Sequence, residues 1–535
     1  MKPEISRKNL IKSLETRDIW DVIIIGGGAS GLGAALDAAA RGYKTLLLEQ
    51  FDFTIGTSSR STKLVHGGVR YLAQGNVALV LEALRERGLL LKNAPHLVRN
   101  QKFLIPSYKR WFKPYYTLGL TIYDILAGKL SFGRSVPYSA KKTLKTIPVL
   151  KKKNLKGGIL YHDGQFDDSR LGINLVQTII EKGGVPLNYM KVTGITKKEG
   201  RITGVISKDF ETGEEYEIKA KVVLNATGVF VNGILQKDDP DMKDVVMASQ
   251  GVHIVLDREF LKSDHAIMIP KTPDGRVLFA VPWHNKVVVG TTDIPKERSL
   301  IEPKPTDEEI NFILETAGQY LTRKPTRKDI KSVFAGLRPL AASSKGANGK
   351  TKEVSRSHKI IVSKSGLVTI IGGKWTTYRQ MGEEVVDKLI TTGGLEKRKC
   401  NTKHLKIHGY KKNPNFNDPL YFYGSDKSIV EELIKKQPDL GEWLSEDLKI
   451  LKAQVIMAVK YEMAQSITDV LARRTRALFL DAEESIKIAP KVASLMAHEL
   501  FKDKKWELEQ TEIFNSIANN YLIKKENNVE VLETA

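Results

Sequence analysis

Cysteine is nearly absent from this chain of 535 residues, which contains only Cys400. An intramolecular disulfide is therefore impossible, and a cysteine-rich zinc site is excluded. The sequence also lacks an apolar run of the roughly 18 residues that a transmembrane helix needs. Its N-terminus lacks the apolar core of a signal peptide, and no DxDxDG-type calcium loop occurs. We therefore expect a soluble or peripherally membrane-bound protein inside the cell, without a metal site.

Acidic residues are scarce relative to basic ones, because 84 Lys and Arg face 62 Asp and Glu, a formal net charge of +22. The excess is uneven. Residues 401–535 hold 20 basic and 21 acidic residues, so the excess lies in residues 1–400. One stretch is extreme: between Lys102 and Lys156 there are 13 basic residues and a single acid, Asp124, with nine aromatic residues interleaved.

Three interpretations of segment 102–156 compete. An anionic membrane surface attracts Lys and Arg at about 1 kcal/mol per charge, and Trp and Tyr prefer the membrane interface. A nucleic acid also attracts basic residues and stacks on aromatic ones. A solvated face of a basic protein needs no partner at all. The nucleotide motif described below disfavours the second interpretation, so we expect no nucleic-acid partner.

A chain of this length exceeds one ordinary domain of roughly 150 residues, so we expect at least two. Residues 20–48 have the pattern strand, glycine-rich turn, helix, strand. DVIII is a continuous β-branched run, as in a strand buried on both faces, and GLGAALDAAARG has the small residues of a helix packed tightly on a sheet. GGLEKRKC, near residue 400, marks a boundary. Beyond it, residues 425–523 follow an amphipathic helical pattern.

The glycine-rich turn has the spacing Gly26-x-Gly28-x-x-Gly31 between a strand and a helix. Gly26 permits the tight turn, Gly28 lets a pyrophosphate approach the backbone, and Gly31 lets the helix approach the strand. The helix N-terminus offers free N–H groups to the phosphates. Glu49 ends the next strand, where an acid binds ribose hydroxyls. The combination predicts a dinucleotide site but does not distinguish FAD from NAD.

Two further turns end apolar strands far along the chain: NATG at 225–228 and GGK at 372–374. A second complete GxGxxG, which an enzyme with two dinucleotides would carry, is absent from the sequence. One elongated cofactor held by three separated segments favours FAD.

Several longer motifs occur in the order that one known family shows, namely GTSSRSTKLVHGGVRYL (56–72), YHDGQFDDSRL (161–171), NATG (225–228), GTTD (290–293), GLRPL (336–340) and GGKWTTYR (372–379). Over residues 18–395 the chain closely resembles the FAD-dependent glycerol-3-phosphate dehydrogenases, which are respiratory, quinone-linked enzymes. Residues 401–535, with DVLARRTR (469–476), resemble the C-terminal helical domain of that family.

The resemblance implies an α/β fold. A Rossmann-like FAD domain of glutathione-reductase type is interleaved with an α+β substrate domain, and an all-α domain follows at the C-terminus. The implied boundaries are 18–95, 157–245 and 345–398 for the FAD domain, 96–156 and 246–344 for the substrate and membrane-facing domain, and 400–525 for the C-terminal domain.

The resemblance also implies a reaction. The flavin takes a hydride from C2 of sn-glycerol 3-phosphate, giving dihydroxyacetone phosphate, and the electrons pass to a quinone. The protein would be cytoplasmic and bound peripherally to the inner face of the cytoplasmic membrane through segment 102–156, and analogy with relatives suggests a homodimer. The nearest alternative is a glycerol-3-phosphate oxidase, which reduces oxygen to hydrogen peroxide. An amino-acid oxidase of the same fold and a non-catalytic flavin-binding protein are more distant alternatives.

A dianionic phosphate favours Arg for its planar fork and Lys as a point charge. Arg338, in GLRPL, and Lys374, in GGKWTTYR, match family positions in the substrate pocket. Arg356 and Arg60 are weaker candidates, since several family members carry a small residue where Arg60 stands.

His253, in GVHIVL, resembles the active-site histidine of the family. With a pKa near its ordinary value of about 6.5, it would accept the proton of the C2 hydroxyl. Thr292, or its neighbour Thr291, is expected to bond a substrate hydroxyl.

The resemblance places the cofactor along the three turns and along the segment that carries the longest motif. Besides Gly26, Gly28, Gly31 and Glu49, the expected FAD-binding residues are Ala29, Ser30, Thr57, Ser58, Ser59, Ser61, Thr62, Lys63, His66, Gly67, Gly68, Ala226, Thr227, Gly228, Gly373, Lys374, Trp375 and Thr376.

Overall fold

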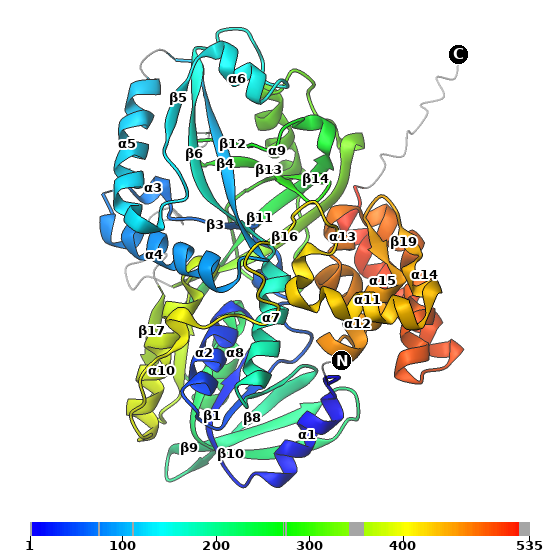
Figure 1. Cartoon of the computed structure of the whole chain (residues 1–535). Helices are drawn as coiled ribbons and strands as arrows, with labels where there is room; N and C mark the ends of the chain where they lie inside the picture. The colour runs from blue at the N-terminus through cyan, green and yellow to red at the C-terminus, as the bar shows by residue number, and fades with distance from the viewer. Residues whose placement is uncertain are drawn as a thin grey trace, which may run out of the picture.

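The computed structural model describes residues 3–72, 75–109, 112–270, 272, 275–341 and 358–523 (Figure 1). Within these ranges the chain forms two large β-sheets, one above the other in Figure 1, and a mainly helical C-terminal domain packed beside both. The predicted α/β fold with interleaved domains and a helical C-terminal domain is thus confirmed. Arg356 lies outside the described residues.

The first sheet has a parallel centre with the strand order β18-β10-β1-β2-β7, and β17 adds antiparallel to β18 at one edge. An antiparallel ribbon of β8 and β9 continues from β10. The strands are β1 (Trp20–Ile25), β2 (Thr45–Leu48), β7 (Val185–Leu187), β8 (Met190–Lys198), β9 (Arg201–Asp209), β10 (Glu215–Asn225), β17 (Lys359–Val362) and β18 (Val368–Ile371).

The continuous apolar run of strand β1 is explained by burial on both faces of the sheet. Val22 and Ile24 are fully buried in the core shared with helices α2 (Ala29–Ala40), α7 (Asp168–Glu181) and α10 (Tyr378–Gly393). Ile23 and Ile25 point to the opposite face, into the core formed with β8 and β9. A strand covered on both faces has no solvent side, so its sequence does not alternate. Helix α1 (Arg7–Thr16) packs near β7.

The second sheet is mixed and larger, with the order β15-β11-β14-β13-β12-β4-β6-β3, while β16 pairs with β11 and β5 with β6. Helix α9 (Asp307–Tyr320) shares a core with β11 and β14. The strands are β3 (Leu64–Val65), β4 (Val98–Ser107), β5 (Val136–Tyr138), β6 (Gly157–Phe166), β11 (Val246–Asp257), β12 (Ala266–Ile269), β13 (Leu278–Trp283), β14 (Lys286–Gly290), β15 (Ile294–Lys296) and β16 (Ile330–Ala341).

The outer part of the second domain consists of helices α3 (Val69–Leu72), α4 (Val77–Asn93), α5 (Phe112–Ala127) and α6 (Ala140–Thr146). Helix α8 (Val231–Asp238) follows β10 in the first domain. No described helix is both long and apolar enough to cross a bilayer.

The chain crosses between the sheets more often than the predicted boundaries allow. Segment 157–245 was assigned to the FAD domain, but its first strand, β6, pairs with β4 along its whole length in the second sheet. Strand β3, within segment 18–95, also joins the second sheet. The sequence of β6 is buried almost throughout, and such a pattern does not reveal which sheet supplies the partners.

The C-terminal domain contains helices and one short ribbon of β19 (Trp443–Ser445) and β20 (Ile450–Leu451). Its core continues into the second sheet, because Trp283 and Phe334 belong to the same buried cluster. The domain therefore shares a core with the sheet. Its helices are α11 (Lys427–Lys436), α12 (Lys452–Glu462), a π-helix (Asp469–Arg474), α13 (Ala477–Leu480), α14 (Ala482–Leu500) and α15 (Lys504–Ala518).

Candidate active site

Three glycine-rich turns meet at one edge of the first sheet. Strands β1, β10 and β18 are parallel neighbours, with Ile25 opposite Asn225, so their carboxyl ends lie together. The turns that follow, at 26–28, 226–228 and 372–374, line one cavity of about 510 Å³. Ligands of open α/β sheets bind at this edge. The structure thus joins the three segments that the sequence singled out.

The first turn requires its glycines. Gly26 has φ +111°, and a Cβ there would lie 2.7 Å from the Ala226 carbonyl oxygen. A Cβ on Gly31 would lie 1.9 Å from the Gly26 carbonyl oxygen, so α2 can approach the turn only without it. Gly28 caps α2 without a side-chain bond. The N-terminus of α2 therefore faces the cavity, where backbone N–H groups suit a pyrophosphate.

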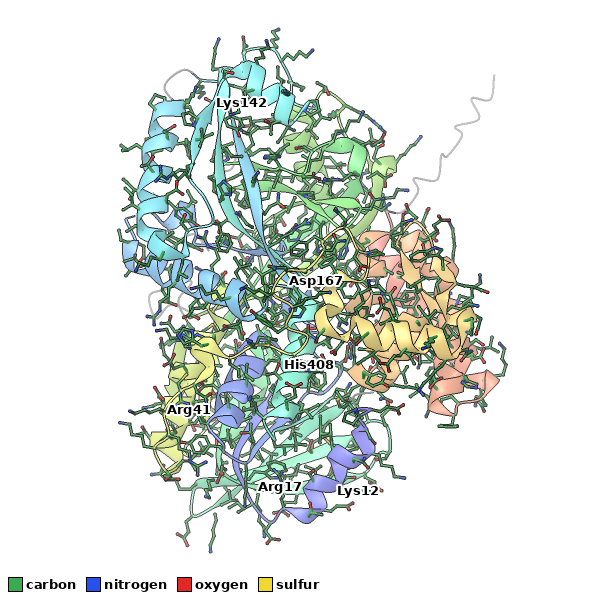
Figure 2. The ribbon with its side chains drawn as sticks, viewed as in Figure 1. Lys12, Arg17, Arg41, Lys142, Asp167 and His408 are labelled. Atoms are coloured by element: carbon green, nitrogen blue, oxygen red, sulfur yellow. The ribbon has the colours of Figure 1, made fainter. Side chains whose placement is uncertain are left out.

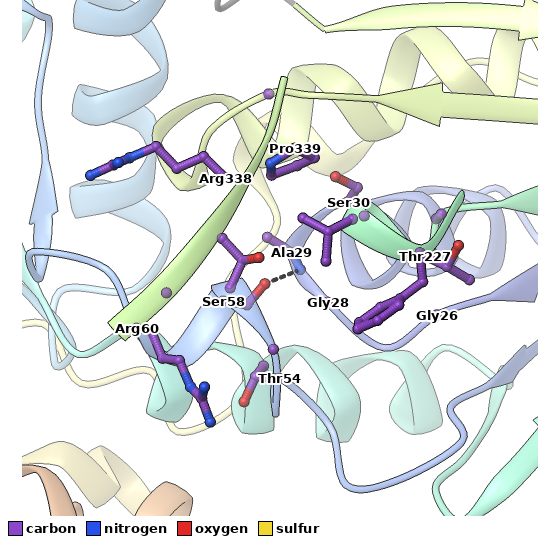
Figure 3. A pocket seen from close by; sticks show the side chains of 18 of the residues that line it. Gly26, Gly28, Ala29, Ser30, Thr54, Ser58, Arg60, Thr227, Arg338 and Pro339 are labelled. Carbon is purple, nitrogen blue, oxygen red and sulfur yellow. Dashed lines mark hydrogen bonds between the residues drawn. The ribbon is translucent and has the colours of Figure 1, made fainter. Parts of the chain in front are cut away.

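Residues 52–66, here called the crossing segment, leave the first sheet after β2 and enter the second sheet at β3. The three glycine-rich turns and the N-terminus of α2 are here called the cradle. Ser58 fixes the crossing segment to the cradle, because its Oγ accepts from Ala29 N at 2.9 Å (Figure 3). Its carbonyl accepts from Trp375 Nε1 at 2.8 Å. Thr57 Oγ1 donates to the Leu337 carbonyl at 2.5 Å. The segment thereby forms a wall of the cavity between the two sheets.

At the other end of the cavity lies Arg338, which β16 carries beside β11 (Figure 3). Its guanidinium donates to Asp293 at 3.2 Å and to Thr291 Oγ1 at 3.1 Å. A Cβ on Gly251 would lie 2.3 Å from Arg338 Nη2, so that glycine makes room for the guanidinium. An oriented Arg in a cavity can bind a phosphate or carboxylate.

His253 lines the cavity from β11. Its Nε2 lies 2.9 Å from Thr62 Oγ1, and its ring stacks on Phe334 with 4.9 Å between the ring centroids. Burial, together with the charges of Arg338 and Lys63, holds its pKa well below 6.5. This corrects the expectation of a pKa near its ordinary value, because the ring is shielded from water. His253 is therefore neutral at physiological pH and able to accept a proton.

Lys374 reaches the cavity from the turn after β18, and its ammonium lies 4.2 Å from the centroid of the Tyr71 ring. Such a cation–π contact restricts where the ammonium lies. Sequence reasoning missed Tyr71 as a cavity residue. Its position inside the motif GTSSRSTKLVHGGVRYL was the available signal.

Glu49 also lines the cavity, and its backbone carbonyl accepts from Met190 N at 2.8 Å. Its Oε2 accepts from Gly27 N at 2.7 Å and its Oε1 from Phe51 N at 3.0 Å. Burial raises the pKa of this carboxyl. Each oxygen keeps a lone pair for a hydroxyl, and ribose is the expected partner.

The expected site residues divide by position. The residues that line the cavity are Gly26, Gly28, Ala29, Ser30, Glu49, Thr57, Ser58, Arg60, Ser61, Thr62, His66, Ala226, Thr227, Gly228, His253, Arg338, Gly373, Lys374, Trp375 and Thr376. Those that lie outside its lining are Gly31, Ser59, Lys63, Gly67, Gly68 and Thr292.

Two of these outlying residues have buried partners that explain their position. The Lys63 ammonium donates to Asp168 at 2.7 Å and to the Ser59 carbonyl at 2.7 Å, away from the cavity. Thr292 Oγ1 accepts from Val252 N and donates to Glu309 at 2.7 Å. We therefore no longer expect Lys63 to bind FAD or Thr292 to bind substrate.

The expectation that Arg60 binds the substrate is also corrected. Its guanidinium forms an ion pair with Glu302 and donates to the Ile301 carbonyl at 2.8 Å. In Figure 3 the side chains of Arg60 and Arg338 extend in different directions. Arg60 thus stabilises the wall of the cavity, and its fork is not directed at a phosphate.

Gly67 and Gly68 follow the crossing segment. A Cβ on Gly67 would lie 2.5 Å from both the Leu84 and Tyr123 side chains, and Gly67 N donates to Tyr123 Oη at 2.8 Å. Gly67 therefore allows close packing of the chain, and it lies behind the cavity wall.

Comparison with known families gives two matches. Residues 21–379 match the family model described as FAD dependent oxidoreductase. Residues 369–507 match the model described as the C-terminal domain of alpha-glycerophosphate oxidase.

Proteins of similar sequence and solved structures of similar fold include the same kind of enzyme. The chain is 37% identical to the mitochondrial glycerol-3-phosphate dehydrogenase of Macaca fascicularis, over 95% of this chain and 74% of the relative. It is 37% identical to the enzyme of that name from Saccharomyces cerevisiae, over 95% and 91% of the two chains. The glycerol-3-phosphate dehydrogenase from Bacillus halodurans, solved with FAD, superposes with a TM-score of 0.78 and 29% identity, covering 97% and 99%. L-α-glycerophosphate oxidase from Mycoplasma pneumoniae, at 16% identity and a TM-score of 0.56, covers 73% and 98% and shares the fold.

The cradle can be tested by Gly31→Ala. The added methyl group would collide with the Gly26 carbonyl and push α2 away from the turn. Overpacking of this kind costs about 1–3 kcal/mol, so binding of FAD to the apoprotein should weaken by about tenfold or more. Flavin fluorescence during titration of the apoprotein measures this.

Gly119→Ala is the matched control, since Gly119 lies in helix α5 with open space around its Cβ position. Circular dichroism of both apoproteins verifies folding. Unchanged FAD affinity in folded Gly31→Ala protein would contradict the cradle geometry.

Proposed function

Because the chain belongs to the family of FAD-dependent glycerol-3-phosphate dehydrogenases, we propose that it oxidises sn-glycerol 3-phosphate to dihydroxyacetone phosphate and passes the electrons to a membrane quinone. The resemblance and the FAD cofactor predicted from the sequence are confirmed by these relatives. The observation that carries the proposal is a single cavity that is lined both by the three glycine-rich turns and by His253, Arg338 and Lys374.

The phosphate of the proposed substrate matches the positive charges of Arg338 and Lys374. A phosphate dianion takes two N–H bonds from a planar guanidinium and attracts an ammonium as a point charge. Arg338 is held by Asp293 and Thr291, and Lys374 lies over Tyr71, so both cations are restricted before a ligand arrives. This preorganisation lowers the entropic cost of binding.

FAD supplies the acceptor for the hydride that leaves C2. The protein must then take the proton of the C2 hydroxyl. We assign this role to His253 Nε2, with the Thr62 hydroxyl beside it as its hydrogen-bond partner. The depressed pKa keeps the ring in its basic form.

An anaerobic absorbance titration tests the function. We expect sn-glycerol 3-phosphate to bleach the oxidised flavin band, a quinone analogue to restore it rapidly, and air to restore it slowly. Fast recovery in air with release of hydrogen peroxide would indicate an oxidase, and absence of bleaching would rule out this substrate.

Arg338→Lys, measured in the same titration, tests the phosphate assignment. A hydrogen bond to a charged group contributes about 1.5–3 kcal/mol, so half-bleaching should need about tenfold to hundredfold more substrate. Arg323→Lys is the control, because Arg323 is exposed and pairs with Glu259 and Asp329.

The pH dependence follows from His253. A histidine with a depressed pKa loses its basic form only when the pH falls through that lower value, so kcat/KM should stay constant down to below pH 6.5 and then decline. His253→Gln should remove this acidic limb and lower kcat by about 10²- to 10⁴-fold. An acidic limb centred above pH 6.5 in the wild-type protein would contradict the assignment.

One helix of segment 102–156 has the apolar face that a membrane-binding surface needs. Within segment 102–156, helix α5 exposes Tyr115, Leu118, Ile122 and Ile125, which recur every three or four residues and so share one face. The exposed fractions of Leu118 and Ile125 are 66% and 71%. Helix α5 lies at the outer edge of the second domain in Figure 1. We propose that this face enters an anionic membrane at its inner surface, next to the basic residues of the segment, where quinone is reached.

The double variant Leu118→Glu/Ile125→Glu tests this face. Burial of a large apolar side chain contributes about 1.5–3 kcal/mol, so binding to vesicles of anionic phospholipid should fall by more than about hundredfold. Phe501→Glu is the control, since Phe501 is 95% exposed on the C-terminal domain. Cosedimentation measures binding, and equal binding of the double variant and wild type would refute this surface.

A further inference from the structure

The motif DVLARRTR (469–476) has no role in the cavity, yet its arginines are among the most buried side chains of the molecule. Arg473, Arg474 and Arg476 are 3%, 0% and 1% exposed. The first two close the π-helix Asp469–Arg474, an irregularity often found at functional sites. Buried arginines require partners, and these arginines find theirs largely outside their own domain.

Two of the arginines converge on the start of the crossing segment. Arg474 donates to both carboxylate oxygens of Asp52, at 2.5 and 2.9 Å, and Arg473 pairs with the same carboxylate. Against the effect of burial, the two guanidinium groups lower the pKa of Asp52. Asp52 lies three residues after Glu49, so this end of the segment is fixed to the C-terminal domain beside the expected ribose site.

Arg476 holds the middle of the segment. It donates to the Ser59 carbonyl at 3.1 Å and to Asp168 at 2.9 Å. Lys63 Nζ donates to the same two groups, at 2.7 Å each. Asp168 also accepts from Ser61 N at 3.2 Å and Ser61 Oγ at 2.7 Å. Figure 2 shows the adjacent Asp167 at the centre of the molecule, where the two sheets and the C-terminal domain meet.

A third contact fixes the segment from the end of the described chain. Tyr521 Oη donates to Glu302 at 3.1 Å, and Glu302 forms the ion pair with Arg60. The C-terminal domain thus reaches the crossing segment at Asp52, Ser59 and, through Glu302, Arg60.

The residues held in this way are direct neighbours of residues that line the cavity, and Ser61 itself belongs to the lining. Ser58 precedes Ser59 and accepts from the cradle at Ala29 N. Thr62 follows Ser61 and lies beside His253 Nε2. Neighbouring residues share a backbone, so holding Ser59 and Ser61 restricts where Ser58 and Thr62 lie. Their hydroxyls are then within reach of Ala29 N and His253 Nε2.

We propose that Arg476 is a positioning residue, through which the C-terminal domain holds the crossing segment so that Ser58 and Thr62 face the flavin and His253. The role given to Thr62 and His253 rests on the proposed function, whereas the role of Ser58 requires only that FAD binds.

The test compares Arg476→Met with the double variant Arg170→Met/Glu462→Gln. The second variant also removes a buried ion pair between the C-terminal domain and α7 (2.6 Å), but that pair does not touch residues 52–66. Arg476→Met leaves Lys63 paired with Asp168. FAD affinity is measured by flavin fluorescence on refolded or FAD-stripped apoprotein, and unfolding temperature is measured on both variants.

We expect Arg476→Met to weaken FAD binding by at least about tenfold, and the control pair by less than about twofold, at similar unfolding temperatures. Arg476→Lys keeps the positive charge but has a single donor nitrogen, so it should give an intermediate FAD affinity. It replaces Arg476→Met in the test if the Met variant does not fold. Equal loss in Arg476→Met and in the control, or full affinity in both Arg476 variants, would overturn the proposal.

A second readout addresses Thr62 and His253. In protein saturated with FAD, Arg476→Met should lower kcat while KM for sn-glycerol 3-phosphate stays within about twofold, because Arg338 is held by Asp293 and Thr291. An unchanged kcat would overturn this part. If the wild-type protein does not turn over this substrate, the proposed function fails, and the FAD titration still decides the role of Arg476.

Discussion

The buried carboxylate of Asp168 is the point on which the two sheets and the C-terminal domain depend. It stands at the first residue of α7, directly after β6 of the second sheet, while α7 itself covers the first sheet. A carboxylate with no exposure is costly unless it is paired and fully hydrogen-bonded. Here Lys63, Arg476 and Ser61 supply the donors. Those partners come from the crossing segment and the C-terminal domain, so the carboxylate can be satisfied only when all parts are in place. Burial lowers the pKa of Lys63 to about 7, although the Asp168 carboxylate acts in the opposite direction.

The active cavity lies beside this junction because the crossing segment must pass from one sheet to the other there. On the side of the first sheet, the carboxyl ends of parallel strands and the N-terminus of α2 offer N–H groups for a dinucleotide. On the side of the second sheet, the antiparallel pair β11–β16 places His253 and Arg338 on adjacent strands. Under the proposed function, the turns of the first sheet hold the cofactor, while His253 and Arg338 of the second sheet, with Lys374 from the first, act on the substrate.

The fold was largely predictable, since the apolar run of β1, the GxGxxG turn and the two later glycine turns are local signals that require a parallel sheet edge. The sequence did not show that β6 belongs to the second sheet, because a strand buried on both faces has the same pattern in either sheet. Within the site, the turns and Arg338 were found from their motifs. The sequence did not show that the side chains of Lys63 and Thr292 are bound by Asp168 and Glu309, because these partners lie 105 and 17 residues away. The roles of Arg473, Arg474 and Arg476 depend on contacts across more than 300 residues, which one sequence cannot reveal.

We propose that one cavity holds FAD at the glycine-rich turns of the first sheet and a three-carbon phosphate beside Arg338, Lys374 and His253. A crystal structure of the FAD-loaded protein with dihydroxyacetone phosphate, which cannot reduce the flavin, tests it most directly. We expect the cofactor pyrophosphate at the N-terminus of α2, the ligand phosphate within hydrogen-bond distance of Arg338 and Lys374, and the C2 oxygen next to His253 Nε2 and Thr62. A phosphate bound elsewhere, without a contact to Arg338, would contradict it.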